Sequence, residues 1–157
     1  MTLQAAPLKI VLGASIATVD AALWDSLEHE GVPFLKHAFL AALESSGAVG
    51  AGTGWTPRPL CLYEDERLVG AVPLYEKSHS YGEFVFDFAW AHAYHEHGLA
   101  YYPKLVAATP FTPARGPRRH PRSRRPAADK VIVTRRDGRG VGNISVAPRQ
   151  VFCNRLA

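Results

Sequence analysis

The composition of this chain changes abruptly after Ala114, and that change limits which residues can form a folded core. The segment RGPRRHPRSRRPAADK, residues 115–130, contains six arginines and three prolines and has no apolar periodicity. Such a segment cannot bury enough apolar surface to offset the entropy lost on ordering. We therefore predict a folded body in residues 1–118. Residues 119–157 are expected to form a disordered basic tail or the product of a shifted reading frame.

The net charge follows the same division. Residues 1–114 carry six Lys and Arg against twelve Asp and Glu, a net charge of −6, whereas residues 115–157 carry twelve against two, a net charge of +10. The basic tail predicts, as one alternative function, nonspecific and salt-dependent binding of nucleic acid. The tail has only one aromatic residue that could stack on bases, Phe152, which argues against recognition of single strands.

Length and cysteine content narrow the class of protein. At 157 residues the chain matches about one globular domain. Cys61 and Cys153 lie far apart without the CxxC spacing of a zinc ribbon, so we expect a reducing, cytoplasmic location. The early run LKIVLGASIA has one lysine and is interrupted by Gly13 and Ser15, which favours a strand over an export signal. No run reaches the roughly 20 apolar residues of a membrane span.

The acidic body alternates between the periodicities of strands and helices. A strand is predicted over residues 8–16, followed by a short helix that Asp20 caps and Gly31 ends. VPFLKHAFLAALESSG has apolar residues at helical spacing, with Gly47 as its stop. The glycine-rich run GAVGAGTGWTP follows this helix, whereas a phosphate-binding loop follows a strand and opens a helix. We interpret the run as a flexible connection.

Strand signals dominate the next segment. PLCLYEDERLVGAVPLYEK predicts a β-hairpin with a charged turn, and Gly70 and Pro73 predict a bulge or an interrupted ladder in its second strand. A short helix ended by Gly98 and a strand over KLVAATPF follow. Strands and helices mix without clean βαβ repeats. This predicts an α+β fold with a central, mostly antiparallel sheet and flanking helices.

The stretch HSYGEFVFDFAWAHAY, residues 79–94, is rich in aromatic and acidic side chains. As a strand over residues 79–88, it places its phenylalanines on a core face and Tyr81, Glu83 and Asp87 on the other. The backbones of Glu83 and Asp87 are then about 13 Å apart, whereas a glycosidase needs carboxyls about 5 to 9.5 Å apart. As a helix, the two residues would lie one turn apart and could share a pocket. A carboxylate that only accepts structural hydrogen bonds is the more frequent case.

Histidines offer two further candidate sites. His92 and His95 would share one side of a helix, with Glu96 one turn from His92. A clear fourth ligand is missing, so exposed histidines explain the pattern better than a metal. His37 sits between apolar residues of the predicted helix, where we expect a capped or partly buried histidine rather than a base.

A series of linked motifs resembles the FemAB-like proteins of peptidoglycan biosynthesis or recognition, a bacterial branch of the GNAT acyltransferase superfamily. The motifs cover about residues 20–118 and read VPFLKHAFLAALESSGAVG, TGWTPRPL, LVGAVPLYEKSHSYGEFVFDFAWAHAY and HGLAYYPKLVAATPFTPARGPR. The resemblance implies a partial GNAT-like domain that transfers an acyl or aminoacyl group to an amine, with acyl-CoA or aminoacyl-tRNA as donor. It implies a small-molecule or peptidoglycan-precursor substrate, contacted by His79, Tyr81, Glu83 and Asp87. It transfers no catalytic, cofactor-binding or metal-binding residue.

Proteins of this kind are much longer and have two GNAT-type halves, and the resemblance ends after Arg118. We therefore expect a truncated protein that is inactive alone, or a gene remnant without function. One motif argues the other way, because a strand over KVIVT precedes Arg135, Gly138 and Gly140 in the RxxGxG spacing of an acetyl-CoA pyrophosphate loop. Such a loop should open a helix, and residues 144–148 are poor helix formers.

Overall fold

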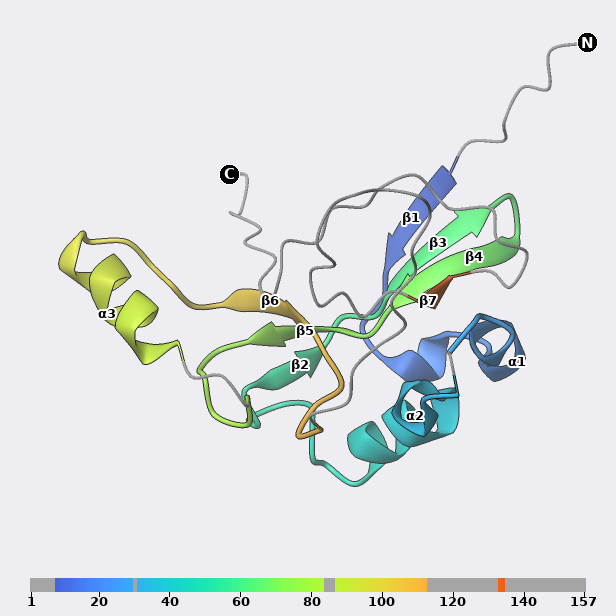
Figure 1. Cartoon of the computed structure of the whole chain (residues 1–157), viewed down its shortest axis with the longest axis horizontal. Coiled ribbons are helices and arrows are strands. Elements are labelled where there is room, and N and C mark those ends of the chain that lie inside the picture. Colours follow the sequence, from blue (N-terminus) through green and yellow to red (C-terminus); the bar gives the residue numbers. More distant parts are fainter. Residues whose placement is uncertain (1–7, 30, 84–86, 113–132, 135–157) are drawn as a thin grey trace, which may run out of the picture.

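The computed structural model describes residues 8–29, 31–83, 87–112 and 133–134, and Figure 1 labels their secondary structure. The helices described are α1 (Ala21–Asp25), α2 (His37–Ser45) and α3 (Phe88–Glu96), with 3₁₀ turns η1 (Ile16–Thr18) and η2 (Pro33–Leu35). The strands described are β1 (Leu8–Leu12), β2 (Trp55–Pro57), β3 (Leu60–Glu64), β4 (Arg67–Val72), β5 (Leu74–Lys77), β6 (Lys104–Ala107) and β7 (Val133–Thr134).

The strands are divided between two sheets. One sheet has the order β1-β3-β4-β7 and the other has the order β2-β5-β6. Every pairing among the described strands is antiparallel. The prediction of a mixed α+β fold with mostly antiparallel strands is therefore confirmed.

The predicted hairpin is formed by β3 and β4 and leads into the second sheet. It turns at Asp65, whose φ is +54°. The register shifts beside Gly70, where Val69 is the extra residue of β4. Pro73, which has no N–H to donate, separates β4 from β5. Both the bulge and the interrupted ladder expected from Gly70 and Pro73 are present.

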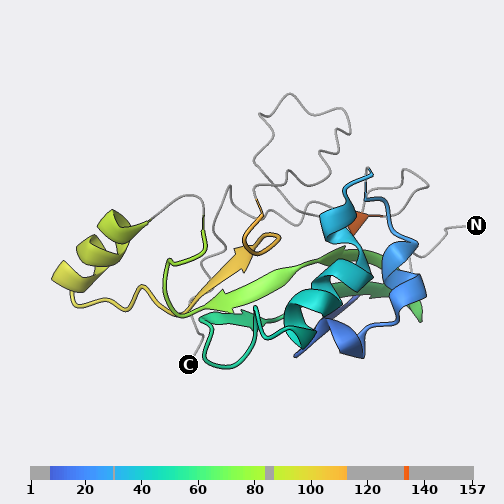
Figure 2. The ribbon, with the colours of Figure 1, turned by 90° about the horizontal axis from the view of Figure 1, so that it is seen from below.

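Helices α1 and α2 pack on one face of the β1-β3-β4-β7 sheet, as Figure 2 shows from below. Trp24 of α1 is completely buried there, and its Nε1 donates a hydrogen bond to the carbonyl of Leu35 at 2.8 Å. The rest of this core consists of Ile16, Val19, Leu27, Leu35, Leu40, Cys61, Leu68 and Ala71. The core fixes the position of α2 and of the chain that leaves it.

Local sequence signals explain where these helices begin and end. The Asp20 carboxylate accepts a hydrogen bond from Leu23 N at 2.9 Å, so the predicted cap of α1 is confirmed. After α2, Gly47 has a φ of +72°, as expected of a glycine that stops a helix. The helix predicted from Val32 onward begins only at His37, because Pro33 opens η2 and Lys36 is extended, with ψ of 143°.

A second, smaller core supports the β2-β5-β6 sheet. It contains Val49, Trp55 and Tyr75, with Leu43 of α2 packed against it. The glycine-rich connection between α2 and β2 follows a helix, as predicted. It is tied into turns by backbone hydrogen bonds, including Gly50 N to Trp55 O at 2.8 Å. Trp55 is thereby held beneath the chain that follows β5.

Helix α3 projects beyond the β2-β5-β6 sheet, at the end of the molecule opposite α1 and α2 (Figures 1 and 2). None of its residues is buried. Its existence and its stop are as predicted, since Gly98 follows it with a φ of +67°. The stretch between β5 and α3 therefore lies at the outer end of the second sheet.

Candidate functional site

The described chain after β5, residues 78–83, forms bends and a turn where a strand was predicted. Glu83 N donates to Ser80 O at 3.4 Å, and Gly82 has a φ of +82°, which does not fit an extended strand. Phe88 begins α3 and is 51% exposed, so the predicted core face is wrong at this residue. Residues 84–86, with the other two phenylalanines of that face, lie outside the described residues. The strand prediction is wrong in its described part.

The turn brings Glu83 and Asp87 to one cation instead of spacing them along a strand. Glu83 Oε2 lies 3.0 Å from Lys104 Nζ. The same amine donates a hydrogen bond to Asp87 Oδ2. Lys104 belongs to β6, and its side chain is only 1% exposed. Both carboxylates therefore share a buried lysine that comes from a strand far along the chain.

A second buried lysine lies across the sheet, because Lys77 is the register partner of Lys104 in the β5–β6 pair. Lys77 Nζ donates to the carbonyl of Tyr81 at 2.6 Å and lies 3.8 Å from the centroid of the Trp55 ring. It is also 4.0 Å from Glu83 Oε1. Two positive and two negative side chains thus form a neutral group, the charged cluster: Lys77, Glu83, Asp87 and Lys104.

Neutral donors complete the surroundings of Asp87. The hydroxyl of Ser80 donates to Asp87 Oδ1, and the hydroxyl of Tyr101 donates to Oδ2 at 2.5 Å. The Tyr102 hydroxyl lies 3.4 Å from Oδ1 and also hydrogen-bonds Ser80. A carboxylate with this many donors is stabilised in its ionised form.

The two carboxylates of the charged cluster are shifted in opposite directions. Burial raises the pKa of Glu83, and the hydrogen bond from Lys104 opposes this only in part. Burial also acts to raise the pKa of Asp87, but the hydrogen bonds from Lys104 and Tyr101 outweigh it and hold that pKa below its usual value. When their environments shift the pKa values of two carboxyl groups in opposite directions, the two groups are suited to different roles in proton transfer. Glu83 is suited to take up a proton, and Asp87 to remain an anion.

One carboxylate oxygen of Glu83, Oε1, has Lys77 Nζ as an ionic neighbour at 4.0 Å but takes part in no hydrogen bond within the described part of the chain. This oxygen is buried. The Glu83 side chain as a whole is 13% exposed, so it is not sealed from solvent. A buried acceptor without a donor is costly in a folded protein and calls for an explanation such as a catalytic or binding role.

Lys77 gives the charged cluster a testable dependence on pH. Burial holds the pKa of Lys77 at about 8, below the ordinary 10.5. Between these values the unfolded chain keeps a proton that the folded chain has released, so stability rises with pH in this window. The rise is at most about 1.4 kcal/mol per pH unit. We expect Lys77→Met to reduce this rise, measured by urea denaturation at steps across the window.

Burial raises the pKa of Cys61, and this opposes the rise of stability with pH above pH 9. The contribution of Cys61 is common to the wild type and to Lys77→Met, so the comparison of the two isolates that of Lys77. Lys9→Met removes a positive charge from an exposed position of β1 and serves as the control. It should keep the wild-type slope. Equal slopes in the wild type and in Lys77→Met would show that Lys77 does not titrate in this window.

His79 and Tyr81 lie beside the charged cluster instead of within it. The two rings are in edge-to-face contact, with centroids 5.3 Å apart, and His79 Nδ1 accepts a hydrogen bond from Tyr81 N at 3.2 Å. The Tyr81 side chain is 67% exposed. Of the four predicted contact residues, the structure therefore joins Glu83 and Asp87 to one cation and leaves the two rings outside.

Sequence reasoning missed the residues that hold the two carboxylates. These are Lys77, Lys104, Ser80, Tyr101 and Tyr102. A signal existed for the lysines, since each lies at the end of a short strand that contains apolar residues, LYEK and KLVA. A lysine in such a strand needs a carboxylate partner, and acidic residues that could serve lie between the two strands.

The other histidines behave as structural or surface residues. His37 Nε2 contacts the carbonyls of Ile16 and Val19 at 3.0 and 3.1 Å, so the expected partly buried histidine is confirmed. His92 Nδ1 and Glu96 form an exposed pair at 3.6 Å on α3. Within the described part of the chain, no group of three or more His, Cys, Asp and Glu residues could hold a metal ion.

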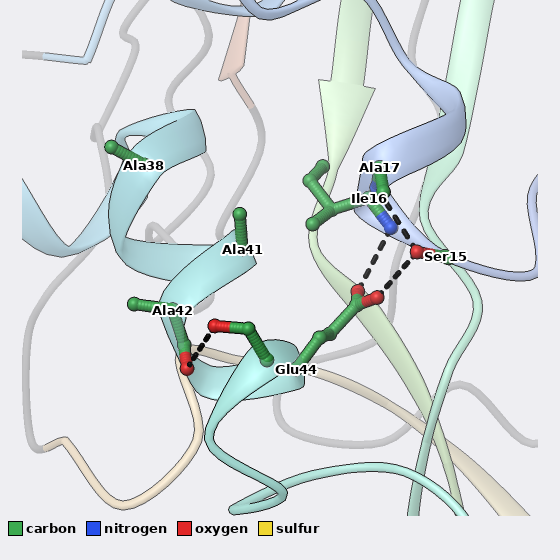
Figure 3. Close-up of a pocket in the computed structure, with 8 residues that line it drawn as sticks. Ser15, Ile16, Ala17, Ala38, Ala41, Ala42 and Glu44 are labelled. Atoms are coloured by element: carbon green, nitrogen blue, oxygen red, sulfur yellow. Dashed lines mark hydrogen bonds between the residues drawn. The ribbon is translucent and has the colours of Figure 1, made fainter.

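An open hollow of about 610 Å³ lies between η1 and α2 (Figure 3), and no residue of the charged cluster lines it. Glu44 stands at its edge, with hydrogen bonds from the Ser15 hydroxyl at 2.5 Å and from Ile16 N at 2.8 Å. Both of its oxygens are therefore used in holding η1 to α2. The hollow is lined by Ser15, Ile16, Ala17, Ala38, Ala41, Ala42, Glu44 and Ser45 and contains none of the predicted site residues.

The strand predicted before the RxxGxG spacing is present in part as β7, which pairs with β4. Arg135, Gly138 and Gly140 themselves lie outside the described residues. Across the residues that the structure describes, no helix has the length and apolar character of a membrane span.

The geometry defines the protein as an α+β protein with a buried cluster of two lysines and two carboxylates. Comparison with family models places it further: residues 15–139 match the FemAB-like family, described as peptidoglycan biosynthesis/recognition. The match covers most of the chain, so the protein belongs to this family, and the suspected resemblance is confirmed. The match extends beyond Arg118, where the recognisable motifs end. No curated protein and no solved structure matches.

Proposed function

We propose that the charged cluster is the acceptor side of a site that transfers an acyl or aminoacyl group to an amine of a peptidoglycan-related substrate. The family supports the substrate class. The observation that carries the chemistry is the state of Glu83, whose buried Oε1 lacks a described hydrogen-bond donor and whose pKa is raised. A carboxylate in that state can accept the proton that the amine loses as it attacks a carbonyl.

The remaining members of the charged cluster position this base. Lys104 holds Glu83 through Oε2, and Oε1, which lies 4.0 Å from Lys77 Nζ without a hydrogen bond, is the oxygen that would take the proton of the amine. Asp87 balances Lys104 and takes donors from Ser80 and Tyr101, so it stays ionised and is not the base. The donor of the acyl group, acyl-CoA or aminoacyl-tRNA, is part of the proposal and comes from the family resemblance alone. As the amide bond forms, the thioester or ester bond of the donor breaks, and CoA leaves as a thiol or the tRNA as its ribose hydroxyl, with the proton that Glu83 has taken from the amine.

The test is an acylation assay on the full chain. The acceptor is a muropeptide with a free amine, acetyl-CoA and a mixture of aminoacyl-tRNAs are supplied as donors, and the product is detected by mass spectrometry. We expect Glu83→Gln to lower the rate of acylation by about 100-fold or more, because the amide cannot accept the proton. The matched control is Glu76→Gln on β5, a carboxylate that is 41% exposed and pairs with Arg58.

Each outcome of the assay decides a separate point. Transfer by the wild type contradicts the expectation that the chain is inactive alone. No transfer from either donor by a folded wild-type chain overturns the proposal. Equal loss of rate in Glu83→Gln and Glu76→Gln overturns the role of Glu83 as base.

A further inference from the structure

Three aromatic side chains form a row along the outer side of the charged cluster. The rings of His79 and Tyr81 are 5.3 Å apart, and those of Tyr81 and Phe88 are 6.1 Å apart, each pair edge to face. Tyr81 and Phe88 are both among the exposed large side chains. The row begins two residues after Lys77, and Phe88 directly follows Asp87. The row therefore adjoins the charged cluster in sequence, and the carbonyl of Tyr81 contacts the cluster through Lys77 Nζ.

The base of the row is rigid although its central ring is exposed. The carbonyl of Tyr81 accepts hydrogen bonds from two buried donors, Lys77 Nζ at 2.6 Å and Trp55 Nε1 at 3.2 Å. The neighbouring rings hold the Tyr81 ring on two sides. An exposed aromatic side chain that is already ordered loses little entropy when a ligand stacks on it. The row thus has the property expected of a binding surface rather than of a mobile turn.

The charges near the row favour a neutral ligand. Lys77 and Lys104, beneath it, are buried and engaged with carboxylates, so they offer no free cation to a phosphate. Aromatic faces carry negative charge density and attract the C–H groups of a ligand, and the hydroxyl of Tyr81 adds a polar contact at the ring edge. A pyranose ring has an apolar C–H face and a rim of hydroxyls, which match these two features.

We propose that the row formed by His79, Tyr81 and Phe88 is a saccharide subsite on which a neutral N-acetylated sugar ring of the substrate stacks. This rests on the proposed function, since the subsite would hold the glycan part of a peptidoglycan-related substrate while Glu83 faces its amine. The exposed rings and the engaged lysines favour a neutral ligand with an apolar face, and the choice of an N-acetylated sugar follows from the peptidoglycan-related family.

The test is isothermal titration of the full chain with N,N′,N″-triacetylchitotriose, a neutral trimer of N-acetylglucosamine without a free amine. We expect Tyr81→Ala to weaken binding by about tenfold, because the stacking face is lost. Tyr81→Phe keeps the ring and should stay within about threefold of the wild type. Trp90→Ala is the control, since Trp90 is an exposed aromatic residue of α3 that is two positions from Phe88 and faces another side of the helix.

No binding of the trimer by the wild type, or equal binding by Tyr81→Ala, would overturn the subsite. Tighter binding of adenosine than of the trimer would overturn the ligand class. The test is separable from that of the proposed function because the trimer has no amine to acylate. Binding of the trimer without acyl transfer to a muropeptide would support the subsite and reject the transfer reaction. Acyl transfer without binding of the trimer would support the transfer reaction and reject the subsite.

Discussion

Lys104→Met is expected to lower the free energy of unfolding by about 3–5 kcal/mol, because it leaves buried carboxylates without their shared cation. Lys104 Nζ contacts both Glu83 and Asp87, and its side chain is almost completely buried. Methionine fills a similar volume, so the loss comes from charge and hydrogen bonding and not from a cavity. The measurement is urea denaturation at neutral pH, followed by circular dichroism.

Two comparisons make this expectation specific. Lys9→Met removes a lysine from an exposed position of β1 and should change the stability little. Adding Asp87→Asn to Lys104→Met removes the negative charge that Lys104→Met leaves in excess and should restore part of the loss. If Lys104→Met is as stable as the wild type, the charged cluster does not form in solution.

Gly82→Ala is expected to have the second largest effect, a loss of about 1–2 kcal/mol from backbone strain and about 1–3 kcal/mol from overpacking. Gly82 has a φ of +82°, and a Cβ at this position would lie 2.8 Å from Trp55 Nε1 and 2.6 Å from the Phe111 ring. The Phe111 ring is half exposed and can move, but Trp55 is buried and cannot. The loss is measured as the shift of the urea midpoint.

Gly52→Ala separates the two contributions. Gly52 has nearly the same φ, +78°, but a Cβ there would meet no atom within 4 Å. Gly52→Ala should therefore show the backbone strain alone. Equal losses in the two variants would mean that Trp55 does not pack against the turn as described.

Local signals in the sequence predicted much of the fold. Asp20 as a cap, Gly47 and Gly98 as stops, and the Gly70 and Pro73 irregularities all act through the backbone of their own neighbourhood. They could be interpreted without knowledge of distant residues. Two helix ends were exceptions: Pro33 and Lys36 delay the start of α2 by several residues, and α1 ends at Asp25, before the predicted stop at Gly31.

The turn before α3 could not be predicted in the same way. Alternating aromatic residues after His79 favour a strand, but Gly82 adopts a positive φ and the chain folds back. What stabilises that turn is tertiary: Lys77 binds the carbonyl of Tyr81, and Lys104 binds Glu83 from 21 positions away. The periodicity of apolar residues carries no information about partners that are distant in sequence. Sequence reasoning therefore identified the two carboxylates as candidates but missed the lysines that bind them.

The pairing of Lys77 with Lys104 in the β5–β6 register has a consequence for the order of folding. Like charges directly opposite each other resist strand pairing. This ladder can close at low cost only once the intervening chain has delivered Glu83 and Asp87. The turn and the outer end of the sheet should therefore form together as one cooperative step, so that an open site with an intact sheet is not a populated state.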